Sequence, residues 1–502
     1  MKYLQSVLII IIIIAISSCR KDFSTVSSFG RLEFSKDTVF LDTIFTNIGS
    51  STYNLKVYNR SDQAISIPEI RLENGPTSNY RLNVDGIPGK TFQDVEILAQ
   101  DSIFVFIETT IDFNQVPDPL YTDKILFDNG TNQQDVDLVT LVQDATFIFP
   151  GRDPITLEID NLSLDGQSTT TQGRFLEDSE LTFTKDKPYV IYGYAAVPAN
   201  KTLTIEAGAK LHFHSNSGLI IDREATLKVN GTLDEKVSFE GDRLEQGFDN
   251  VPGQWGTIWM RAGSRDNEIN HSIIKNGVVG VLVDSIGSDT TPTLKIQNSE
   301  IYNQSSFGIL GREANIEGNN LVIGDAGQVS FAGTVGGTYN LDHCTFANYW
   351  SNSLRTLPAV LINNFFTFQN AQGQNIIGTA DLKAANFTNC IIYGNNNIEF
   401  VLDRAVGSSF NYMIENCLIQ FDDFNGSFAN NNELNFTDTT HYLNNIINQN
   451  PDFKTPFEED FRIGANSPAI NKAKASPISL DILGVSRTAA PDIGAYQHIT
   501  FN

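Results

Sequence analysis

A short motif that recurs seven times between residues 269 and 419 constrains the fold more than any other feature. Each copy has an apolar residue, Asn or His two places later, a small or apolar residue next, and an apolar residue two places beyond that. The copies begin at Ile269, Ile296, Ile316, Leu341, Leu361, Phe387 and Ile414, and the one at Ile316 is degenerate. Neighbouring copies start 20 to 27 residues apart, which favours one solenoid coil for each copy.

The Asn or His position predicts a sharp corner between two strands, because Asn tolerates the left-handed backbone region. Stacked corners can then pass amide hydrogen bonds from coil to coil. Cys344, Cys390 and Cys417 follow this position in three copies, where we expect small apolar fillers. A disulfide between Cys390 and Cys417 is the alternative, since neighbouring coils lie about 4.8 Å apart.

Upstream of the repeats, three segments resemble the opening coils of bacterial parallel β-helix proteins of the pectin-lyase-like superfold. They are residues 198–213, 227–232 and 252–258. Together with the repeats, the resemblance covers roughly residues 190–425. It implies an all-β fold class, with a right-handed parallel β-helix that we place at residues 149–455.

The first residues have the layout of a secretory signal peptide: Lys2, an apolar run over 7–16, small residues and Cys19. The run is shorter than the about 20 residues that span a bilayer. Residues 16–19 resemble the bacterial lipobox, which implies that a signal peptide of residues 1–18 is removed and that Cys19 is lipidated. An ordinary signal peptide that ends near a cysteine is the alternative.

The residue after the lipobox bears on localisation. Arg20 is not the aspartate that retains lipoproteins in the inner membrane of enterobacteria. The resemblance therefore implies a lipid anchor in the outer membrane of a Gram-negative cell, with exposure at the cell surface left open.

Two further parts flank the predicted β-helix. After a polar tether at 19–30, residues 31–148 show short alternating strands separated by Asn, Gly, Pro and Asp, which favours a small β-sandwich. Segments 54–61, 65–67 and 80–82 resemble immunoglobulin-like modules, which implies a stalk.

At the other end, segments 461–471, 481–487 and 491–496 closely resemble the choice-of-anchor Q segment found after β-helices in bacterial surface proteins. We expect residues 456–502 to cap the last coil, because an open end would expose unpaired strand edges. Arg487 and Asp492 are expected to pair across that cap.

The charge balance limits the partners. With 59 acidic and 34 basic residues and a net charge of −25, the chain is not expected to bind nucleic acid. The acidic surface leaves bound Ca²⁺ open, and no other cofactor is expected. His212 and His214 alternate on one predicted strand, so both are expected to face solvent, and no third metal ligand is near them in the sequence.

Catalytic motifs of β-helix enzymes are missing from the sequence. A polygalacturonase-like site needs Gly-His-Gly and Arg-x-Lys, and neither occurs. The weak candidates for a lyase or glycosidase site are Asp403, Arg404, Asp422 and Asp423. A surface ion pair is the alternative for the first two residues, and a turn is the alternative for the Asp pair.

Aromatic residues could stack on sugar rings. Trp350 and Tyr349 directly follow a repeat, where a turn is expected, so they are the candidate ligand contacts. Trp255, beside a predicted tight bend, is expected in the core instead.

These patterns favour a non-catalytic envelope protein whose β-helix flank binds a glycan or another envelope protein. A polysaccharide lyase or glycoside hydrolase acting on an acidic polysaccharide is the first alternative. A structural surface spacer is the second. The sequence alone does not identify the ligand.

Overall fold

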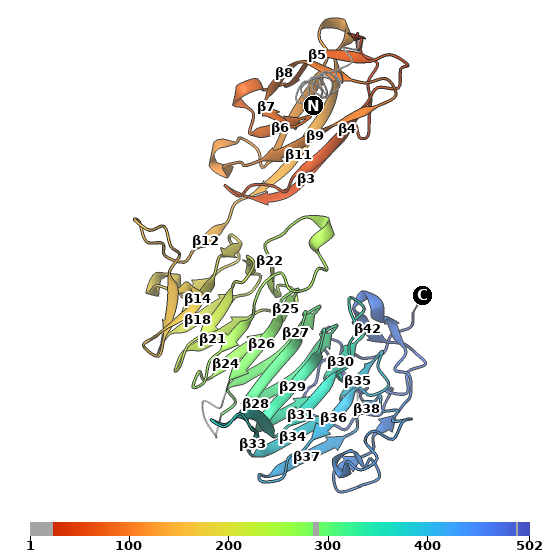
Figure 1. Ribbon diagram of the computed structural model, residues 1–502. Coiled ribbons are helices and arrows are strands. Elements are labelled where there is room, and N and C mark those ends of the chain that lie inside the picture. Colours follow the sequence, from red (N-terminus) through yellow and green to blue (C-terminus); the bar gives the residue numbers. More distant parts are fainter. Residues whose placement is uncertain (1–23, 285–290, 488–489, 502) are drawn as a thin grey trace, which may run out of the picture. The chain divides into compact units, whose positions relative to one another are not determined.

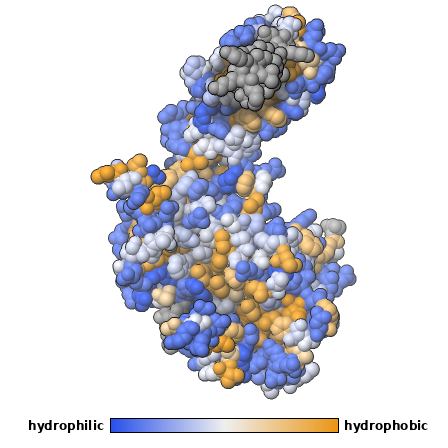
Figure 2. All heavy atoms as spheres, viewed as in Figure 1, coloured by the Kyte–Doolittle hydropathy of each residue, from blue (hydrophilic) through white to orange (hydrophobic). Residues whose placement is uncertain are grey.

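The computed structural model describes residues 24–284, 291–487 and 490–501. Within them the chain forms strands and short 3-10 helices, and no helix there has the length and apolarity needed to cross a membrane. Two compact units divide between Asp144 and Ala145 (Figure 1). Hydrophilic residues cover most of the surface visible in Figure 2, in keeping with the net charge.

The first unit is a sandwich of two β-sheets that share one hydrophobic core. The first sheet contains β1 (Val26–Ser27), β5 (Ile65–Leu72), β8 (Thr91–Ile97), β10 (Leu120–Phe127), β11 (Gln134–Gln143) and β3 (Thr38–Phe45). The second contains β2 (Glu33–Phe34), β4 (Tyr53–Tyr58), β9 (Ser102–Thr109), β6 (Tyr80–Val84) and β7 (Ile87–Gly89).

Part of the segment expected as a tether belongs to this sandwich. Val26 donates its backbone N–H to Ala64, and β1 pairs with β5 in parallel. The backbone N–H of Gly30 donates to the Asp128 carboxylate over 2.8 Å. The predicted signal peptide and the lipidated Cys19 lie outside the described residues.

The second unit is a parallel β-helix, so the all-β fold class is confirmed. Its strands stack into three parallel faces, here called A, B and C. Three long strands turn corners without a break: β27 (Leu294–Tyr302), β28 (Phe307–Gly324) and β29 (Val329–Asp342). β12 (Thr146–Ile148) pairs with β16 (Tyr189–Ile191), so this unit begins before the predicted residue 149.

Parts of the long strands contribute to all three faces. The other main strands of face A are β18 (Thr202–Glu206), β21 (Thr226–Asn230), β24 (Asn267–Asn270), β34 (Leu382–Thr388) and β37 (Phe410–Glu415). Those of face B include β19 (Lys210–Phe213), β22 (Val237–Gly241), β25 (Ser272–Lys275), β30 (Thr345–Asn348), β35 (Ile391–Gly394) and β38 (Leu418–Ile419). Those of face C include β14 (Gln167–Phe175), β17 (Tyr194–Val197), β20 (Gly218–Ile221), β23 (Ile258–Met260), β26 (Val279–Asp284), β31 (Val360–Asn363) and β36 (Phe400–Asp403).

The corner between faces A and B is where the repeated motif predicts it. The corner residues have positive φ angles of 47° to 54° at His271, Asn298, Asn320, His343, Asn389 and Asn416. After each corner the alternation resets, and the next residue points into the core. This confirms the predicted role of Asn and His in the motif.

The motif misplaces the corner in two of its seven copies. In the degenerate copy the corner residue is Asn320, with φ 48°, and not Gly318. The copy at Leu361 lies in β31, which pairs with β29 and β36 on face C, so it forms no A–B corner. A hairpin of β32 (Phe365–Gln369) and β33 (Asn375–Thr379) follows it and lengthens that coil.

The interior of the β-helix is apolar, and its inward aliphatic side chains each contribute about 2 kcal/mol by burial. Cys344, Cys390 and Cys417 lie in this core as free thiols. The filler interpretation of these cysteines is therefore confirmed. Trp255 is 1% exposed and stacks on Phe213, as a core residue should.

The C-terminal segment does not cap the last coil as expected. Its residues pack on the outer side of face B, with Phe461 against Tyr302 and Val322. It also covers the A–B corners, where Asn389 donates to Lys474 and Asn320 to Leu480. The segment that follows β38 closes the end of the β-helix core. Its apolar side chains pack against that core: Phe421, Phe428, Leu434 and Phe436.

In the C-terminal segment, Arg487 and Asp492 contact other groups and do not form the expected ion pair. Arg487 donates to the backbone carbonyl of Asp492 over 3.4 Å and to Asn320 over 2.9 Å. The Asp492 carboxylate accepts from the backbone of Asn471 and lies 2.7 Å from the His498 ring. Arg487 thus fixes the segment to the corner ladder.

Candidate functional site

The outer side of face A carries a row of side-chain amides. Asn230, Asn270, Gln297 and Asn319 occupy one register position on four successive coils. Strand pairing places neighbouring members about 4.8 Å apart. The side chains of Asn230, Gln297 and Asn319 make no hydrogen bond within the described residues, so both their donors and their acceptors are free for a ligand.

A second row lies beside the amides and has alternating charge. Lys228, Glu268, Lys295 and Glu317 share the register position two residues earlier on the same strands. Lys228 and Glu268 are 2.9 Å apart. The charges of this row cancel, so this part of face A is locally neutral although the whole chain carries −25.

The C-terminal segment turns the amide row into a groove. Residues 477–481 and Gly484 face the row across a cavity of about 630 Å³. A second cavity of about 310 Å³ continues it along face A, and the two share Asn270, Gln297 and Asn319. We call this continuous cavity the face A groove.

The floor of the face A groove is held rigid by the corner ladder. Asn320 donates to Asn298, and Asn298 donates to Asn270, each over 3.0 Å. The Nδ1 atom of His271 is buried without a partner. Burial lowers the pKa of His271, which keeps the imidazole neutral, with one donor and one acceptor.

The groove therefore offers rigid, neutral hydrogen-bonding groups at a regular spacing. Amides both donate and accept, as the hydroxyl groups of a sugar do. The carboxylates of Glu268 and Glu317 alternate in register with Lys228 and Lys295, and Asp481 lines the opposite wall.

The structure does not bring the four predicted catalytic residues together. Arg404 pairs with Glu433 at 3.2 Å, and its side chain is 44% exposed. Burial and the charge of Glu433 raise the pKa of Asp403. The Asp423 carboxylate accepts hydrogen bonds from the backbone N–H groups of Ser427 and Phe428. These bonds form a turn, which was the alternative to a catalytic role for the Asp pair.

Asp422 is exposed in the same stretch as that turn. Within the described chain, no hydrogen bond or ion pair joins either aspartate to Asp403 or Arg404. A catalytic role for these four residues stays a prediction.

Of the two predicted aromatic contacts, Tyr349 packs against the C-terminal segment and Trp350 is buried. Trp350 is only 6% exposed, and its indole N–H donates to Ser353 over 2.9 Å. Tyr349 packs between Phe457 and Phe461, with ring centroids at 5.3 and 6.2 Å. Their role in ligand binding stays untested.

Both aromatics line a separate cavity of about 260 Å³ that is also lined by three acidic residues, Asp325, Glu458 and Glu459. Two of them, Asp325 and Glu459, have shifted pKa values. Burial raises the pKa of Asp325 to about 6, against the hydrogen bond from the Tyr349 backbone. Burial and the charge of Asp325 raise the pKa of Glu459 to about 7. Sequence reasoning missed this pair, because its members come from a corner and from the C-terminal segment.

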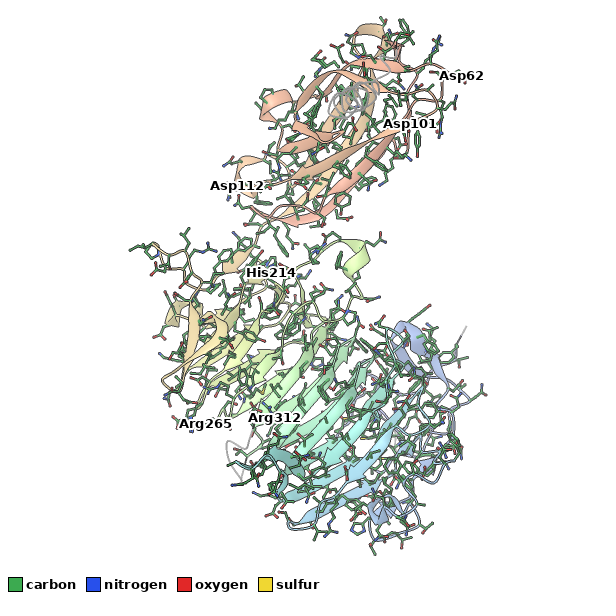
Figure 3. All side chains as sticks on the ribbon, viewed as in Figure 1. Asp62, Asp101, Asp112, His214, Arg265 and Arg312 are labelled. Carbon is green, nitrogen blue, oxygen red and sulfur yellow. The ribbon has the colours of Figure 1, made fainter. Side chains whose placement is uncertain are left out.

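The two predicted surface histidines differ from each other. His212 is 3% exposed and its Nδ1 lies 3.1 Å from the Gly241 carbonyl, so its expected exposure is wrong. His214 is at the surface, stacked on Tyr192 and 2.8 Å from Asp242 (Figure 3). Across the described residues, no three His, Cys, Asp or Glu side chains lie close enough to hold a metal.

Comparison with known proteins adds little to this description. No family model matches the chain, and no curated protein does. A thermostable GH87 α-1,3-glucanase from Streptomyces thermodiastaticus covers 72% of this chain and 79% of its own, at 10% identity and a TM-score of 0.25.

Two other solved structures are similar over shorter parts. A family 123 glycoside hydrolase from Clostridium perfringens covers 24% of this chain at 9% identity and a TM-score of 0.17, and this chain spans 30% of its length. The E. coli chaperone DraB covers 30% of this chain and 78% of its own, at 13% identity and a TM-score of 0.16. TM-scores this low support no argument about function.

Proposed function

We propose that this protein binds an uncharged polysaccharide along the face A groove without cleaving it. The row formed by Asn230, Asn270, Gln297 and Asn319 carries this proposal, because it presents amides at one register position on four coils. Asn270 accepts a hydrogen bond from Asn298, and the other three amides make none within the described residues. A polymer with repeated hydroxyl groups can use such a row at every coil, whereas a small ligand would use one part of it.

The charges favour a neutral ligand over an acidic one. The alternating lysine and glutamate row has no net charge of its own, and Asp481 adds a carboxylate to the groove lining that would repel an acidic ligand. The net charge of −25 also repels polyanions at long range. An uncharged glycan is subject to neither of these repulsions. A partner protein of the envelope remains the second occupant to test.

The place of action is proposed from the sequence. Acyl chains on Cys19 would anchor the chain in the outer membrane, since more than one buried chain gives stable attachment. The β-sandwich would then act as an immunoglobulin-like stalk, and the segment resembling choice-of-anchor Q would form one wall of the groove. Cys19→Ser should move the protein from the membrane fraction to the soluble fraction of the cell.

One observation favours the alternative of a glycoside hydrolase. Asp325 and Glu459 share a cavity and have raised pKa values of about 6 and about 7. Hydrolysis of a glycosidic bond needs one carboxyl group that donates a proton and one carboxylate that accepts one. A hydrolase would place its cleavage site in this cavity and not in the groove.

Incubation of the full chain with a panel of neutral and acidic polysaccharides separates these functions. Retention is measured by affinity electrophoresis, and cleavage by the appearance of reducing or unsaturated ends. We expect retention by a neutral polymer, at least tenfold weaker in the double variant Gln297→Ala/Asn319→Ala, and no new ends. Gln328→Ala, which alters an exposed glutamine outside the groove, is the matched control.

Two results would contradict this proposal. The first is unchanged retention in the double variant. The second is product formation: its loss with Asp325→Asn would assign cleavage to the carboxyl cavity, and its loss with Arg404→Ala would assign it to the predicted Asp403–Arg404 pair.

A further inference from the structure

The far wall of the face A groove carries exposed aliphatic side chains. Leu233 is 42% exposed and Leu480 is 50% exposed, although both line the cavity. A Cβ atom at Gly484 would lie 2.8 Å from Leu233, which places Leu233 against the C-terminal segment. Pro477 and Ile478 extend this surface along the cavity. We call the side chains of Leu233, Pro477, Ile478 and Leu480 the apolar wall.

The apolar wall and the amide row give the groove two unlike sides. Asp481 also lines the wall, but it is 3% exposed, and its carboxylate accepts hydrogen bonds from the backbone N–H groups of Leu483 and Val485. A wholly apolar ligand would bury the amides without hydrogen-bond partners, which is unfavourable. The ligand therefore needs polar groups along one edge and C–H groups on an adjoining face.

The spacing of the amide row favours a glycan over a peptide. Its members lie on successive coils, about 4.8 Å apart. An extended peptide brings equivalent groups to one side only at every second residue, about 6.6 Å apart, so it would lose register with the coils. The unit of an extended glycan is one pyranose ring, whose length is close to the coil spacing. Each sugar can therefore face one amide.

The charged row beside the amides repeats after two coils, because Lys228 and Lys295 alternate with Glu268 and Glu317. Lysine only donates hydrogen bonds, and an ionised glutamate only accepts them. In an extended β-1,4-linked glycan each ring is turned over relative to the one before, so the same edge returns after two sugars. The two repeats match, and both rows line the same cavity.

The apolar wall restricts which sugars fit. In β-linked glucose and xylose every hydroxyl group is equatorial and points outward from the edge of the ring, which leaves only C–H bonds on the two faces. Mannose has one axial hydroxyl group, and a mannan would direct this polar group toward the wall at every second sugar. An α-1,4 linkage bends the chain into a helix, which would leave the straight amide row.

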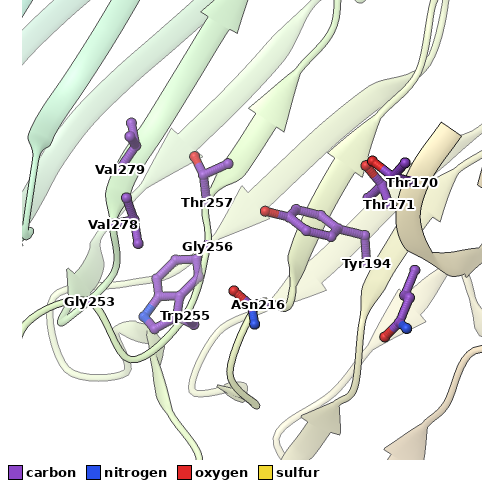
Figure 4. A pocket seen from close by; sticks show the side chains of 11 residues that line it. Thr170, Thr171, Tyr194, Asn216, Gly253, Trp255, Gly256, Thr257, Val278 and Val279 are labelled. Atoms are coloured by element: carbon purple, nitrogen blue, oxygen red, sulfur yellow. The ribbon is translucent and has the colours of Figure 1, made fainter.

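A larger enclosed space elsewhere on the β-helix lacks such a repeat. This cavity of about 550 Å³ lies on the side of face C and shares no residue with the groove (Figure 4). Tyr194 contributes a phenol to its lining, whereas the residue at the same register position on the next coil is Gly218. The lining thus changes from coil to coil, and a regular polymer fits face A better.

We infer that the ligand of the face A groove is an extended β-1,4-linked glycan of sugars whose hydroxyl groups are all equatorial. One edge of each ring meets the amide row, and one face packs on the apolar wall. This inference rests on the proposed function and specifies the class of polymer that the same groove binds.

Calorimetric titration of the full chain with cellohexaose, β-1,4-mannohexaose and maltohexaose tests the inference. Each ligand is long enough to span the four amides. Mannohexaose differs from cellohexaose only in the axial hydroxyl group of each sugar, and maltohexaose differs only in its linkage. We expect cellohexaose to bind with a Kd at least about tenfold below the Kd of the other two.

Substitutions in the wall test how the sugar lies. Leu233→Ala/Leu480→Ala should raise the Kd of cellohexaose about tenfold, because the sugar faces lose apolar contacts. Leu483→Ala is the matched control, since Leu483 is 41% exposed beside the wall but does not line the cavity. Its Kd should equal that of the unaltered chain. Asn216→Ala, in the face C cavity, should also leave the Kd unchanged.

The inference is overturned if mannohexaose or maltohexaose binds as tightly as cellohexaose, or if the double wall variant binds cellohexaose as tightly as Leu483→Ala does. It is also overturned if none of the three ligands binds while another neutral polysaccharide is retained through the amide row. In each of these cases the proposed function stands. Failure to retain any neutral polysaccharide would reject the proposed function itself, and this inference with it.

Discussion

The side-chain amide of Asn320 donates to the side-chain carbonyl of Asn298 on the neighbouring coil, 3.0 Å away, and also to the backbone carbonyl of Leu480. One residue therefore links the stack of coils to the C-terminal segment. Because Asn298 in turn donates to Asn270 in the amide row, the corner ladder, the row and the far wall of the groove form one hydrogen-bonded unit.

Substitution at Asn298 tests the corner. Its φ of 50° is strained for residues with a Cβ atom by about 1–2 kcal/mol. We expect Asn298→Ala to be destabilised more than Asn298→Gly, because both lose the ladder hydrogen bonds and only Ala adds the strain. Chemical denaturation measures the difference. At Asn319, inside β28, the order of Ala and Gly should reverse.

A buried ion pair tests how the later coils are held. Arg355 and Glu399 are 1% and 0% exposed and share two hydrogen bonds, of 2.5 and 2.8 Å. Glu399→Leu leaves the guanidinium buried and unpaired, which should cost about 3–5 kcal/mol of unfolding free energy. The double variant Arg355→Met/Glu399→Leu should recover most of this loss.

The exposed pair of Arg404 and Glu433 is the control for that measurement. With Arg404 44% exposed, its loss in Arg404→Ala should cost less than about 1 kcal/mol. An equal cost for the two pairs would show that burial does not decide their contribution.

The carboxyl cavity predicts a dependence of stability on pH. The pKa values of Asp325 and Glu459 rise to about 6 and about 7 in the folded chain, above the about 4 of unfolded carboxyl groups. Between these limits the folded state holds protons that the unfolded state has released. This contribution to stability is therefore complete below about pH 4 and is lost as the pH rises through 6 and 7.

Urea unfolding at pH 5 and pH 8 checks this prediction. Other carboxylates add their own pH dependence, so the comparison is between the unaltered chain and Asp325→Asn/Glu459→Gln. The double variant should lose less stability than the unaltered chain between the two pH values. An identical difference would mean that the two carboxyl groups titrate normally.

The core cysteines predict thiol reactivity. Cys344, Cys390 and Cys417 are buried and free, and burial raises the pKa of the Cys390 thiol. In a Cys19→Ser chain, a thiol reagent should label none of the three in the native state and all three after unfolding. Fast labelling of the native protein would place at least one thiol at the surface.

Local features were the predictable part of this fold. Asn298 and Asn416 predict corners because the left-handed conformation depends on one residue and its immediate neighbours. The copy at Leu361 has the same residue pattern but lies at the end of a face C strand. The pattern alone therefore does not distinguish an A–B corner from the end of a strand. Contacts between distant segments were not predictable: no sequence signal places Glu459 near Asp325, or Phe457 and Phe461 against Tyr349.

The sequence predicts only part of the groove. Glycan binding along a flank of the β-helix stays a prediction. The sequence does not single out the residues that line the groove, because Asn230 and Gln297 lie outside the corner position of the motif. Their common register follows from strand pairing. The far wall, from residue 477 to 484, depends on how the C-terminal segment folds back.

Calorimetric titration of the full chain with oligosaccharides of increasing length, cut from the neutral polysaccharide that it retains, tests the central claim most directly. If the glycan lies along the four amides of face A, affinity should rise with length until the chain spans the row and then level off. Gln297→Ala/Asn319→Ala should remove most of that rise. An affinity that does not change with length, or a rise that survives in this variant, would contradict binding along face A.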